Sequence, residues 1–218
     1  MVFAFANMCV AQDDNLHITL PSLNPTFIIT FLKILKGMYP LTEGSLTIDG
    51  FDVRQLDKLD LRRQIAYVPQ SPDFFIGTIR DNILMMNPEV SEDDIIAALD
   101  MVDAWNEIAA MPDGLDSLIG RYGQYAVSPT LAYKISLARS YLSNTSIVLI
   151  DEVPNTLLCG HVGRNLKEYL ARIKGKKTVV IITYRDDYMA MADTVIELAR
   201  GKQAVVKTKQ YTKKEEAA

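Results

Sequence analysis

The sequence predicts an α/β fold in which a mostly parallel sheet is covered by helices on both faces. Three continuous apolar runs rich in β-branched residues are too short for helices: Ile65–Val68, Ile147–Ile150 and Thr178–Thr183. Segments with apolar residues at helical spacing separate them, such as Pro129–Leu142. Strands that are apolar on both faces and alternate with helices are typical of a buried parallel sheet.

The first fifty residues predict short strands around one helix. The strand-like runs are Val2–Val10, Leu16–Leu20 and Ser45–Ile48, and the last is closed by a turn at Asp49-Gly50. The helix is expected over Pro25–Lys36, with Gly37 after it.

Residues 78–142 are expected to be mainly helical, with Ser91 as the N-cap of one helix. The last third predicts helices over Val162–Ile173 and Asp187–Ala192, and strands over Thr194–Leu198 and Gln203–Lys207. Residues 208–218 form a polar tail that we expect to fray. The chain should therefore be one domain, 1–218.

Composition excludes several classes of protein. The chain has 218 residues, 49% of them apolar, which is enough for a full core. A net charge of −4 gives no general attraction for nucleic acid, and we interpret the Lys and Arg of the last third as a solvated face. The two cysteines and two histidines are isolated, so no metal site of that kind is expected. No apolar run reaches the roughly 18 residues needed to cross a bilayer.

Two adjacent carboxylates, Asp151 and Glu152, directly follow the strand Ile147–Ile150. A pair at this place can hold Mg²⁺ and polarise an attacking water in a nucleotide hydrolase. Such chemistry also needs a phosphate loop, whose glycines let backbone N–H groups converge on the phosphates. No Gly-x-x-x-x-Gly-Lys-Ser/Thr occurs in the chain. The alternative is that the two carboxylates only cap the strand end.

Several segments, in order, resemble the nucleotide-binding domain of ABC transporters of the exporter type over about residues 8–207. They are Gly44–Gly50, Leu61–Gln70, Asp73–Ile83, Lys134–Leu142, Ile147–Glu152 and Ile181–Arg185. The resemblance implies a P-loop NTPase-like fold with an antiparallel β subdomain and an inserted helical subdomain at about 78–142. It also implies ATP and Mg²⁺ as ligands.

The resemblance assigns roles to individual residues. Asp151 and Gln70 would hold Mg²⁺, and Gln70 would also contact the nucleotide and couple it to the membrane domain. Glu152 would polarise water, and Ser128 retains the hydroxyl of the signature motif. Thr30, in the helix that normally follows the phosphate loop, is a nucleotide-binding candidate. Tyr184 stands where the family has a histidine.

The same motifs depart from the family pattern. Between the strand end at Ile18–Pro21 and Thr30, the segment Ser22–Ile29 has no glycine or lysine, and Pro25 removes one N–H donor. Pro129 and Thr130 replace the two signature glycines, although proline suits a helix N-terminus. Tyr184 cannot supply the charge of an imidazole near neutral pH. We therefore predict that ATP and Mg²⁺ binding is weak or absent.

The part that would touch a membrane domain matches the family better. Phe74, Phe75, Ile76 and Arg80 lie in the segment that faces the membrane domain in exporters, and Gly120 and Gly123 resemble the exporter X-loop. The alternative is that these apolar residues only pack the helical subdomain.

The leading hypothesis is a degenerate exporter ATPase domain at the cytoplasmic side of a membrane, coupling a transmembrane domain to a second nucleotide-binding domain. A homodimer would then have no complete ATP site. A second hypothesis is a working ATPase subunit whose rearranged loop uses Lys33 or Lys36. A third is a soluble scaffold that binds a protein through the old dimer face.

Overall fold

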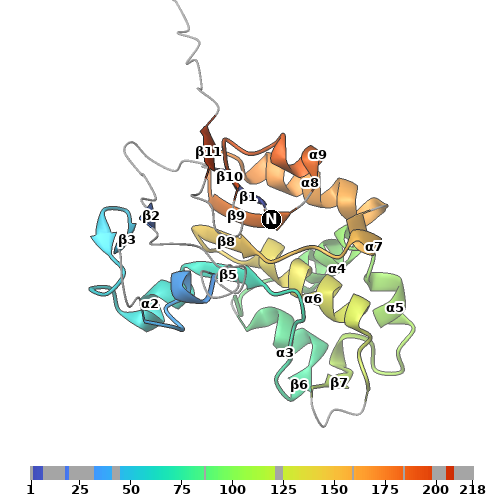
Figure 1. The fold of residues 1–218 in the computed structure, drawn as a ribbon. Coiled ribbons are helices and arrows are strands. Elements are labelled where there is room, and N and C mark those ends of the chain that lie inside the picture. The colour runs from blue at the N-terminus through green and yellow to red at the C-terminus, as the bar shows by residue number, and fades with distance from the viewer. Residues whose placement is uncertain are drawn as a thin grey trace, which may run out of the picture.

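The computed structural model describes residues 2–6, 18–19, 32–40, 45–85, 87–120, 125–158, 160–183, 185–197 and 205–208. Six strands form the main sheet in the order β11-β10-β1-β9-β8-β5 (Figure 1). Their bounds are β1 (Val2–Ala6), β5 (Ile65–Val68), β8 (Ile147–Ile150), β9 (Thr178–Thr183), β10 (Thr194–Glu197) and β11 (Val205–Thr208).

The main sheet is parallel on one side and antiparallel on the other. β5, β8 and β9 run parallel, so that Val68 lies opposite Ile150, and Ile150 opposite Ile181. β1 runs against both β9 and β10, with Val2 opposite both Thr183 and Glu197. Consequently β5, β8, β9 and β10 all end at one edge of the sheet, which we call the carboxyl edge, and β1 ends at the other. The predicted α/β class is confirmed.

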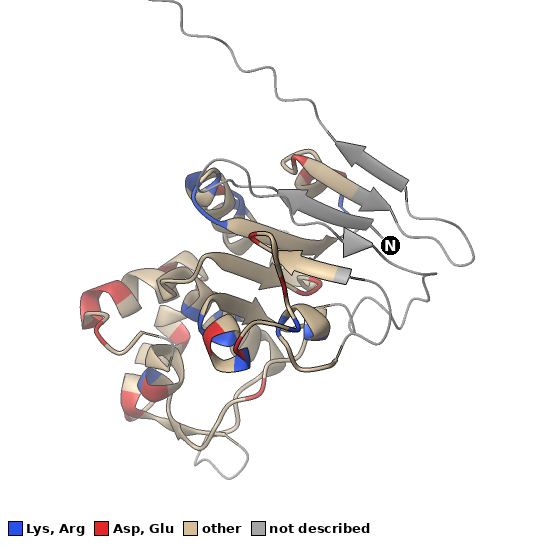
Figure 2. Ribbon diagram, turned by 90° about the vertical axis from the view of Figure 1, so that its left-hand side faces the viewer, with Lys and Arg blue, Asp and Glu red and all other residues tan. Residues whose placement is uncertain are grey.

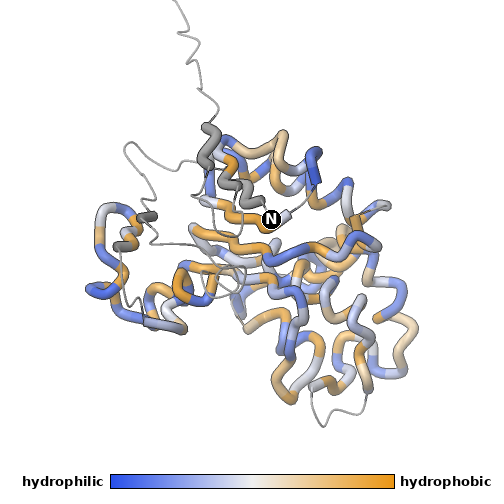
Figure 3. Tube along the Cα trace, viewed as in Figure 1, coloured by the Kyte–Doolittle hydropathy of each residue, from blue (hydrophilic) through white to orange (hydrophobic). Residues whose placement is uncertain are grey.

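Alternate residues of the central strands face two separate cores. Leu149 and Val180 pack with Leu32 and Leu35 of the helical segment 32–35 on one face. Val148, Ile150, Val179 and Ile181 belong to the larger core on the other face, with α6 (Pro129–Leu142) and α8 (His161–Ile173). This two-residue period explains why the strands are apolar throughout. Figure 3 shows them as hydrophobic segments at the centre of the molecule.

Between β5 and β8 the chain forms a mostly helical region. It contains α3 (Ile79–Leu84), α4 (Glu92–Met101), α5 (Trp105–Ala109), a 3-10 turn (Gly114–Asp116) and α6. Ser91 caps α4 as predicted, accepting the N–H of Asp94. The short strands β6 (Gly77–Thr78) and β7 (Leu118–Ile119) pair antiparallel beside these helices.

A small antiparallel sheet lies at the other side of the molecule. It has the order β2 (Ile18–Thr19), β3 (Ser45–Ile48) and β4 (Phe51–Asp52). α2 (Lys58–Arg63) follows, capped by the carboxylate of Asp57. The strand end at Ile18 was expected to lead toward a phosphate loop, but β2 pairs with β3 in this small sheet and not with the main sheet.

Most predicted elements are found close to their predicted bounds. The remaining helices are α7 (Asn155–Leu158) and α9 (Asp186–Met189), and α7, α2, β4, β6 and β7 were not predicted. Of the predicted helix 25–36, only residues 32–35 are seen as helix, and residues 25–31 lie outside the described part. Within the described part, no helix is both long and apolar enough to cross a membrane.

Candidate functional site

Asp151 lies at the carboxyl edge directly after β8 and is 7% exposed. Its backbone N–H continues the ladder to β5 by donating to the carbonyl of Val68, at 2.8 Å. The hydroxyl of Tyr67 donates to its Oδ2 at 3.4 Å, and the N–H of Glu152 donates to Oδ1 at 2.9 Å. Both carboxylate oxygens therefore have donors from the protein itself.

Two tyrosines hold this strand end in place. The Tyr133 hydroxyl, from α6, donates to the carbonyl oxygen of Asp151 at 3.3 Å. Burial raises the pKa of Tyr67 to about 12, with the charge and hydrogen bond of Asp151 adding to the effect. Burial and the charge of Asp151 also raise the pKa of Tyr133. Both hydroxyls thus remain protonated donors at neutral pH.

Glu152 and Gln70 meet across the carboxyl edge. Gln70 is exposed just beyond β5, and its Nε2 donates to Glu152 Oε2 at 3.4 Å. The structure therefore brings together Gln70, Asp151 and Glu152, three residues that the sequence assigned to one site. In the described chain, no group of three or more His, Cys, Asp or Glu side chains could hold a metal ion.

Basic side chains lie beside Tyr67. The Lys36 ammonium is 4.4 Å from the centre of the Tyr67 ring. Arg62 donates from Nε to the Lys36 carbonyl at 3.4 Å and from Nη2 to the Gly37 carbonyl at 3.2 Å. Burial lowers the pKa of Lys36, and the charges of Arg139 and Arg62 lower it further. Lys36, one of the two lysines named in the second hypothesis, thus contacts Tyr67, whose hydroxyl donates to Asp151. Lys33 lies over the ring of Tyr39 instead.

Ser128 is the N-cap of α6, and its hydroxyl accepts the N–H of Leu131 at 3.1 Å. Pro129 follows at the start of the helix and has no N–H. A helix N-terminus binds anions through its free N–H groups. Here the proline removes one of these groups and the Ser128 hydroxyl occupies another, so α6 has a reduced capacity for phosphate.

The carboxyl edge lacks a phosphate loop after each described strand that ends there. The segments that follow β5, β8 and β9 are Pro69–Pro72, Asp151–Pro154 and Tyr184–Asp187, which contain no glycine or lysine. β10 is followed by Leu198-Ala-Arg-Gly-Lys, which lacks the spacing. A phosphate loop joins a strand end to a helix at this edge. β1, beside β9, enters the sheet here rather than ending here.

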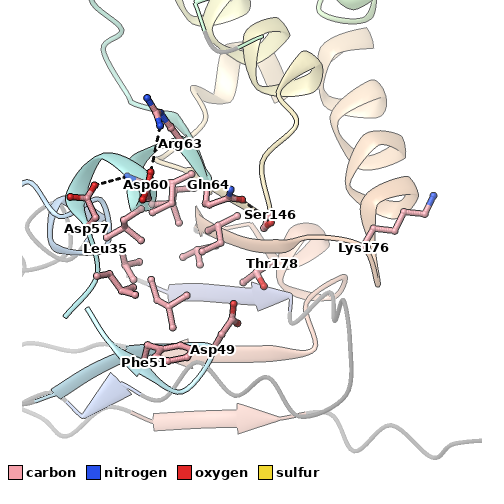
Figure 4. Close-up of a pocket in the computed structure, with 17 residues that line it drawn as sticks. Leu35, Asp49, Phe51, Asp57, Asp60, Arg63, Gln64, Ser146, Lys176 and Thr178 are labelled. Atoms are coloured by element: carbon pink, nitrogen blue, oxygen red, sulfur yellow. Dashed lines mark hydrogen bonds and ion pairs between the residues drawn. The ribbon is translucent and has the colours of Figure 1, made fainter. Parts of the chain in front are cut away.

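A cavity of about 770 Å³ lies at the opposite edge of the sheet (Figure 4). Ile65, Ile147 and Thr178, the first residues of β5, β8 and β9, form part of its wall. Asp49 and Lys176 are at its rim. Leu149 and Val180 also line the cavity, but Asp151, Glu152 and Gln70 do not, so it is separate from the carboxylate site.

The residues expected to face a partner differ from one another in exposure. Phe75 is 44% exposed and Ile76 is 62% exposed, whereas Phe74 packs against the main core. Arg80 is bound within the chain: its Nε donates to Asp116 at 3.0 Å and its Nη1 to Glu92 at 2.7 Å. The alternative of internal packing therefore fits Phe74, and Phe75 and Ile76 remain exposed.

Some predicted residues cannot be placed. Thr30, Tyr184 and Gly123 lie outside the described residues, as do both cysteines. Conversely, Tyr67 and Tyr133 contact Asp151 but were not predicted. The sequence places Tyr67 one residue before the end of a strand, but its contact with Asp151 depends on the parallel pairing of β5 with β8, in which Tyr67 lies opposite Leu149.

The fold and the strand-end carboxylates define a class: α/β domains related to nucleotide-binding ATPases. The sequence profile of the ABC transporter family matches residues 29–155, more than half of the chain. The chain therefore belongs to the ABC transporter family, and it corresponds to the exporter-type nucleotide-binding domain.

Three relatives of this chain are much longer proteins. It is 32% identical to an ATP-dependent lipid A-core flippase of Syntrophus aciditrophicus over 79% of its length. It is 32% identical to P-glycoprotein 14 of Caenorhabditis elegans over 79%, and 30% identical to a lactococcin transport/processing ATP-binding protein LcnC-like of Lactococcus lactis over 87%. The chain spans only 28%, 13% and 26% of these three relatives, respectively.

Proposed function

We propose that the chain is an exporter nucleotide-binding domain that couples to a transmembrane domain with weak or no ATP hydrolysis. One observation carries the proposal. The described strands that end at the carboxyl edge beside Asp151 are not followed by a phosphate loop, and β1 runs the wrong way to supply one. Asp151 and Glu152 lie at the end of β8, but the sequence has no phosphate-loop motif to bind phosphates beside them.

The described residues fit Mg²⁺ better than they fit a nucleotide. Asp151 and Glu152 supply the hard oxygen ligands that Mg²⁺ prefers, but Mg²⁺ in such sites takes its other ligands from water and from substrate phosphates. Ser22–Ile29 offers no glycine or lysine for those phosphates. At α6, Pro129 lacks an N–H and Ser128 caps another. We therefore assign no hydrolytic step to the chain.

The proposal places the domain at the cytoplasmic side of a membrane, held there by a transmembrane domain and paired with a second nucleotide-binding domain. The exposed Phe75 and Ile76 support such docking, because they leave apolar surface for a partner in the segment that faces the membrane domain in exporters.

Calorimetry with Mg-ATP and a phosphate-release assay test the proposal. We expect no saturable heat up to about 1 mM Mg-ATP, which corresponds to a binding free energy weaker than about −4 kcal/mol. Glu152→Gln is the control for hydrolysis. Micromolar binding with turnover that Glu152→Gln abolishes would reject the proposal.

A working ATPase with an atypical loop is the second candidate, and the position of Lys36 favours it. If Lys36 served the phosphates, Lys36→Met would abolish Mg-ATP binding while Lys33→Met would not. The two lysines are a matched pair because both lie over tyrosine rings, at 4.4 Å and 5.6 Å.

A further inference from the structure

The helical region carries charge of one sign. Residues 81–120 contain ten Asp and Glu and no Lys or Arg, whereas the whole chain has a net charge of only −4. All ten acidic residues are exposed. In Figure 2, red segments lie on and between the helices of this region. The rest of the chain is therefore net positive, and the negative charge is confined to this region.

Among the residues that the structure describes, neighbouring cations neutralise only part of this charge. Arg80 bridges Glu92 and Asp116, and Lys134 Nζ lies 3.2 Å from Asp103 Oδ2. In the described part of the chain, no ion pair reaches Asp93, which is exposed in the first turn of α4. A negative surface of this kind attracts basic partners and repels anionic ones.

Three exposed apolar side chains lie next to this charge. Phe75, Ile76 and Leu118 are 44%, 62% and 46% exposed, and we call them the Phe75 patch. β6 pairs with β7 so that Thr78 lies opposite Leu118, which brings the two segments together. Asp73 and Asp116, both exposed, stand two residues before Phe75 and Leu118. Both segments of the patch therefore have an exposed carboxylate two residues before an apolar side chain of the patch.

The backbone beneath the patch is rigid. A Cβ on Gly120 would stand 2.8 Å from the Phe75 carbonyl oxygen, so the two segments are in direct backbone contact. Asn82 Nδ2 donates to that same oxygen at 3.2 Å and to the Thr78 carbonyl at 2.9 Å. A surface formed in advance loses little conformational entropy on binding.

We propose that the segment docking on the Phe75 patch is amphipathic and basic. Its apolar side chains would cover Phe75, Ile76 and Leu118, and its Lys or Arg side chains would face the surrounding carboxylates. The inference rests on the proposed function, because the partner is then a loop of the transmembrane domain. Cytoplasmic loops of membrane proteins carry an excess of Lys and Arg. The same carboxylates repel an anionic lipid surface, which excludes the bilayer as the occupant.

A peptide library displayed on phage tests the charge of the occupant directly. The whole chain is the bait, and the Ile76→Asp variant is used to discard peptides that bind elsewhere. Patch-dependent peptides should be net positive, with apolar residues at helical spacing. Neutral or acidic patch-dependent peptides, or no patch-dependent peptides, would overturn the proposal. Because Ile76 is 62% exposed, the Ile76→Asp variant should fold. Ile76→Ser serves as a second variant.

A synthetic copy of the best peptide then tests the carboxylates. Its affinity should fall at least 10-fold for the double variant Asp73→Lys and Asp93→Lys, and should weaken as NaCl is raised from 50 to 300 mM. Equal affinity for both proteins would overturn the proposal. The chain should not co-sediment with vesicles that contain phosphatidylserine. Co-sedimentation that is lost when Ile76 is replaced would also overturn the proposal.

Failure of this inference can be told apart from failure of the proposed function. Co-purification of the chain with a transmembrane domain encoded beside it tests the function. If co-purification fails while basic peptides are selected, the proposed charge of the occupant is supported and the proposed function is rejected. If co-purification depends on Ile76 while the selected peptides are neutral, the proposed function is supported and the proposed charge of the occupant is rejected.

Discussion

The carboxyl edge of the sheet and the Phe75 patch differ in how their side chains are satisfied. At the carboxyl edge, Asp151 is buried, and Tyr67, Gln70 and the N–H of Glu152 supply donors to the two carboxylates. At the patch, Phe75 and Ile76 are exposed above a rigid backbone. A surface whose groups are already paired gains little from a ligand, whereas exposed apolar surface gains by being covered. The difference favours partner binding over catalysis.

The largest effect is expected at the patch backbone. Gly120 has φ +107°, and a Cβ there would meet the Phe75 carbonyl oxygen at 2.8 Å. Gly120→Ala should lower the free energy of unfolding by about 2 to 4 kcal/mol, since it adds backbone strain and a steric clash. Urea denaturation measures the change.

Gly50→Ala is the matched control for that substitution. Gly50 also has a positive φ, +78°, but its Cβ would meet nothing within 4 Å. Its cost should be about 1 kcal/mol, from backbone strain alone. Equal costs for the two glycines would mean that the patch backbone is not closely packed.

Tyr67→Phe tests whether the carboxyl edge is closed by its own hydrogen bonds. The variant removes the donor to Asp151 Oδ2 but keeps the ring beneath Lys36. The free energy of unfolding should fall by about 1 kcal/mol, because a buried carboxylate loses a donor. Chemical denaturation at pH 7 gives the value.

Tyr125→Phe controls for the loss of a tyrosine hydroxyl. Tyr125 also donates to an aspartate, Asp113 Oδ2 at 3.2 Å, but that carboxylate is exposed. Water replaces the lost bond there, so the change should be within about 0.5 kcal/mol. If both variants cost the same, burial of Asp151 does not matter.

A smaller effect is expected for Arg80→Gln, which removes the ion pairs to Glu92 and Asp116. The Arg80 side chain is 28% exposed, so we expect a loss of about 0.5 to 1 kcal/mol. Arg63→Gln breaks a looser pair with Asp60, at 3.5 Å between side chains that are 77% and 74% exposed. That change should be near zero, and thermal unfolding compares the two variants.

A separate effect is expected on the dependence of stability on alkaline pH. The pKa of Tyr67 is about 12 in the folded protein and about 10 in an unfolded chain. The folded state therefore holds the Tyr67 proton more tightly, and this contribution is complete below pH 10 and is lost as the pH rises toward 12. The stability difference between wild type and Tyr67→Phe should shrink over that range. A constant difference would contradict it.

Sequence patterns located the strands well because the pattern and the environment agree. Ile65–Val68, Ile147–Ile150 and the central residues of Thr178–Thr183 are apolar, and both faces of these strands are buried in the structure. α2 was missed because only Leu61 among its residues is buried, although Asp57 is a clear N-cap signal. Strand order was not predictable, because β1 joins residues far away in the sequence.

The candidate site was only partly predictable from the sequence. Asp151 and Glu152 could be named because they directly follow a buried strand, and Gln70 because the segment Leu61–Gln70 resembles the family segment that ends in this glutamine. The contact of Tyr67 with Asp151 depends on the pairing of β5 with β8, which sequence patterns do not specify. The exposure of Phe75 compared with Phe74 likewise depends on which way the segment before β6 turns.

The place of β1 in the sheet sets an order of events during synthesis. Val2–Ala6 are synthesised well before their two partners, β9 at residues 178–183 and β10 at residues 194–197. At 5 to 20 residues per second, that strand waits roughly 10 to 40 s for its neighbours. Until then the backbone N–H and C=O groups of β1 must form hydrogen bonds to water or be protected by a chaperone. Among the described strands of the main sheet, β1 therefore waits longest for a partner, and the sheet is completed only after β9 and β10 have been made.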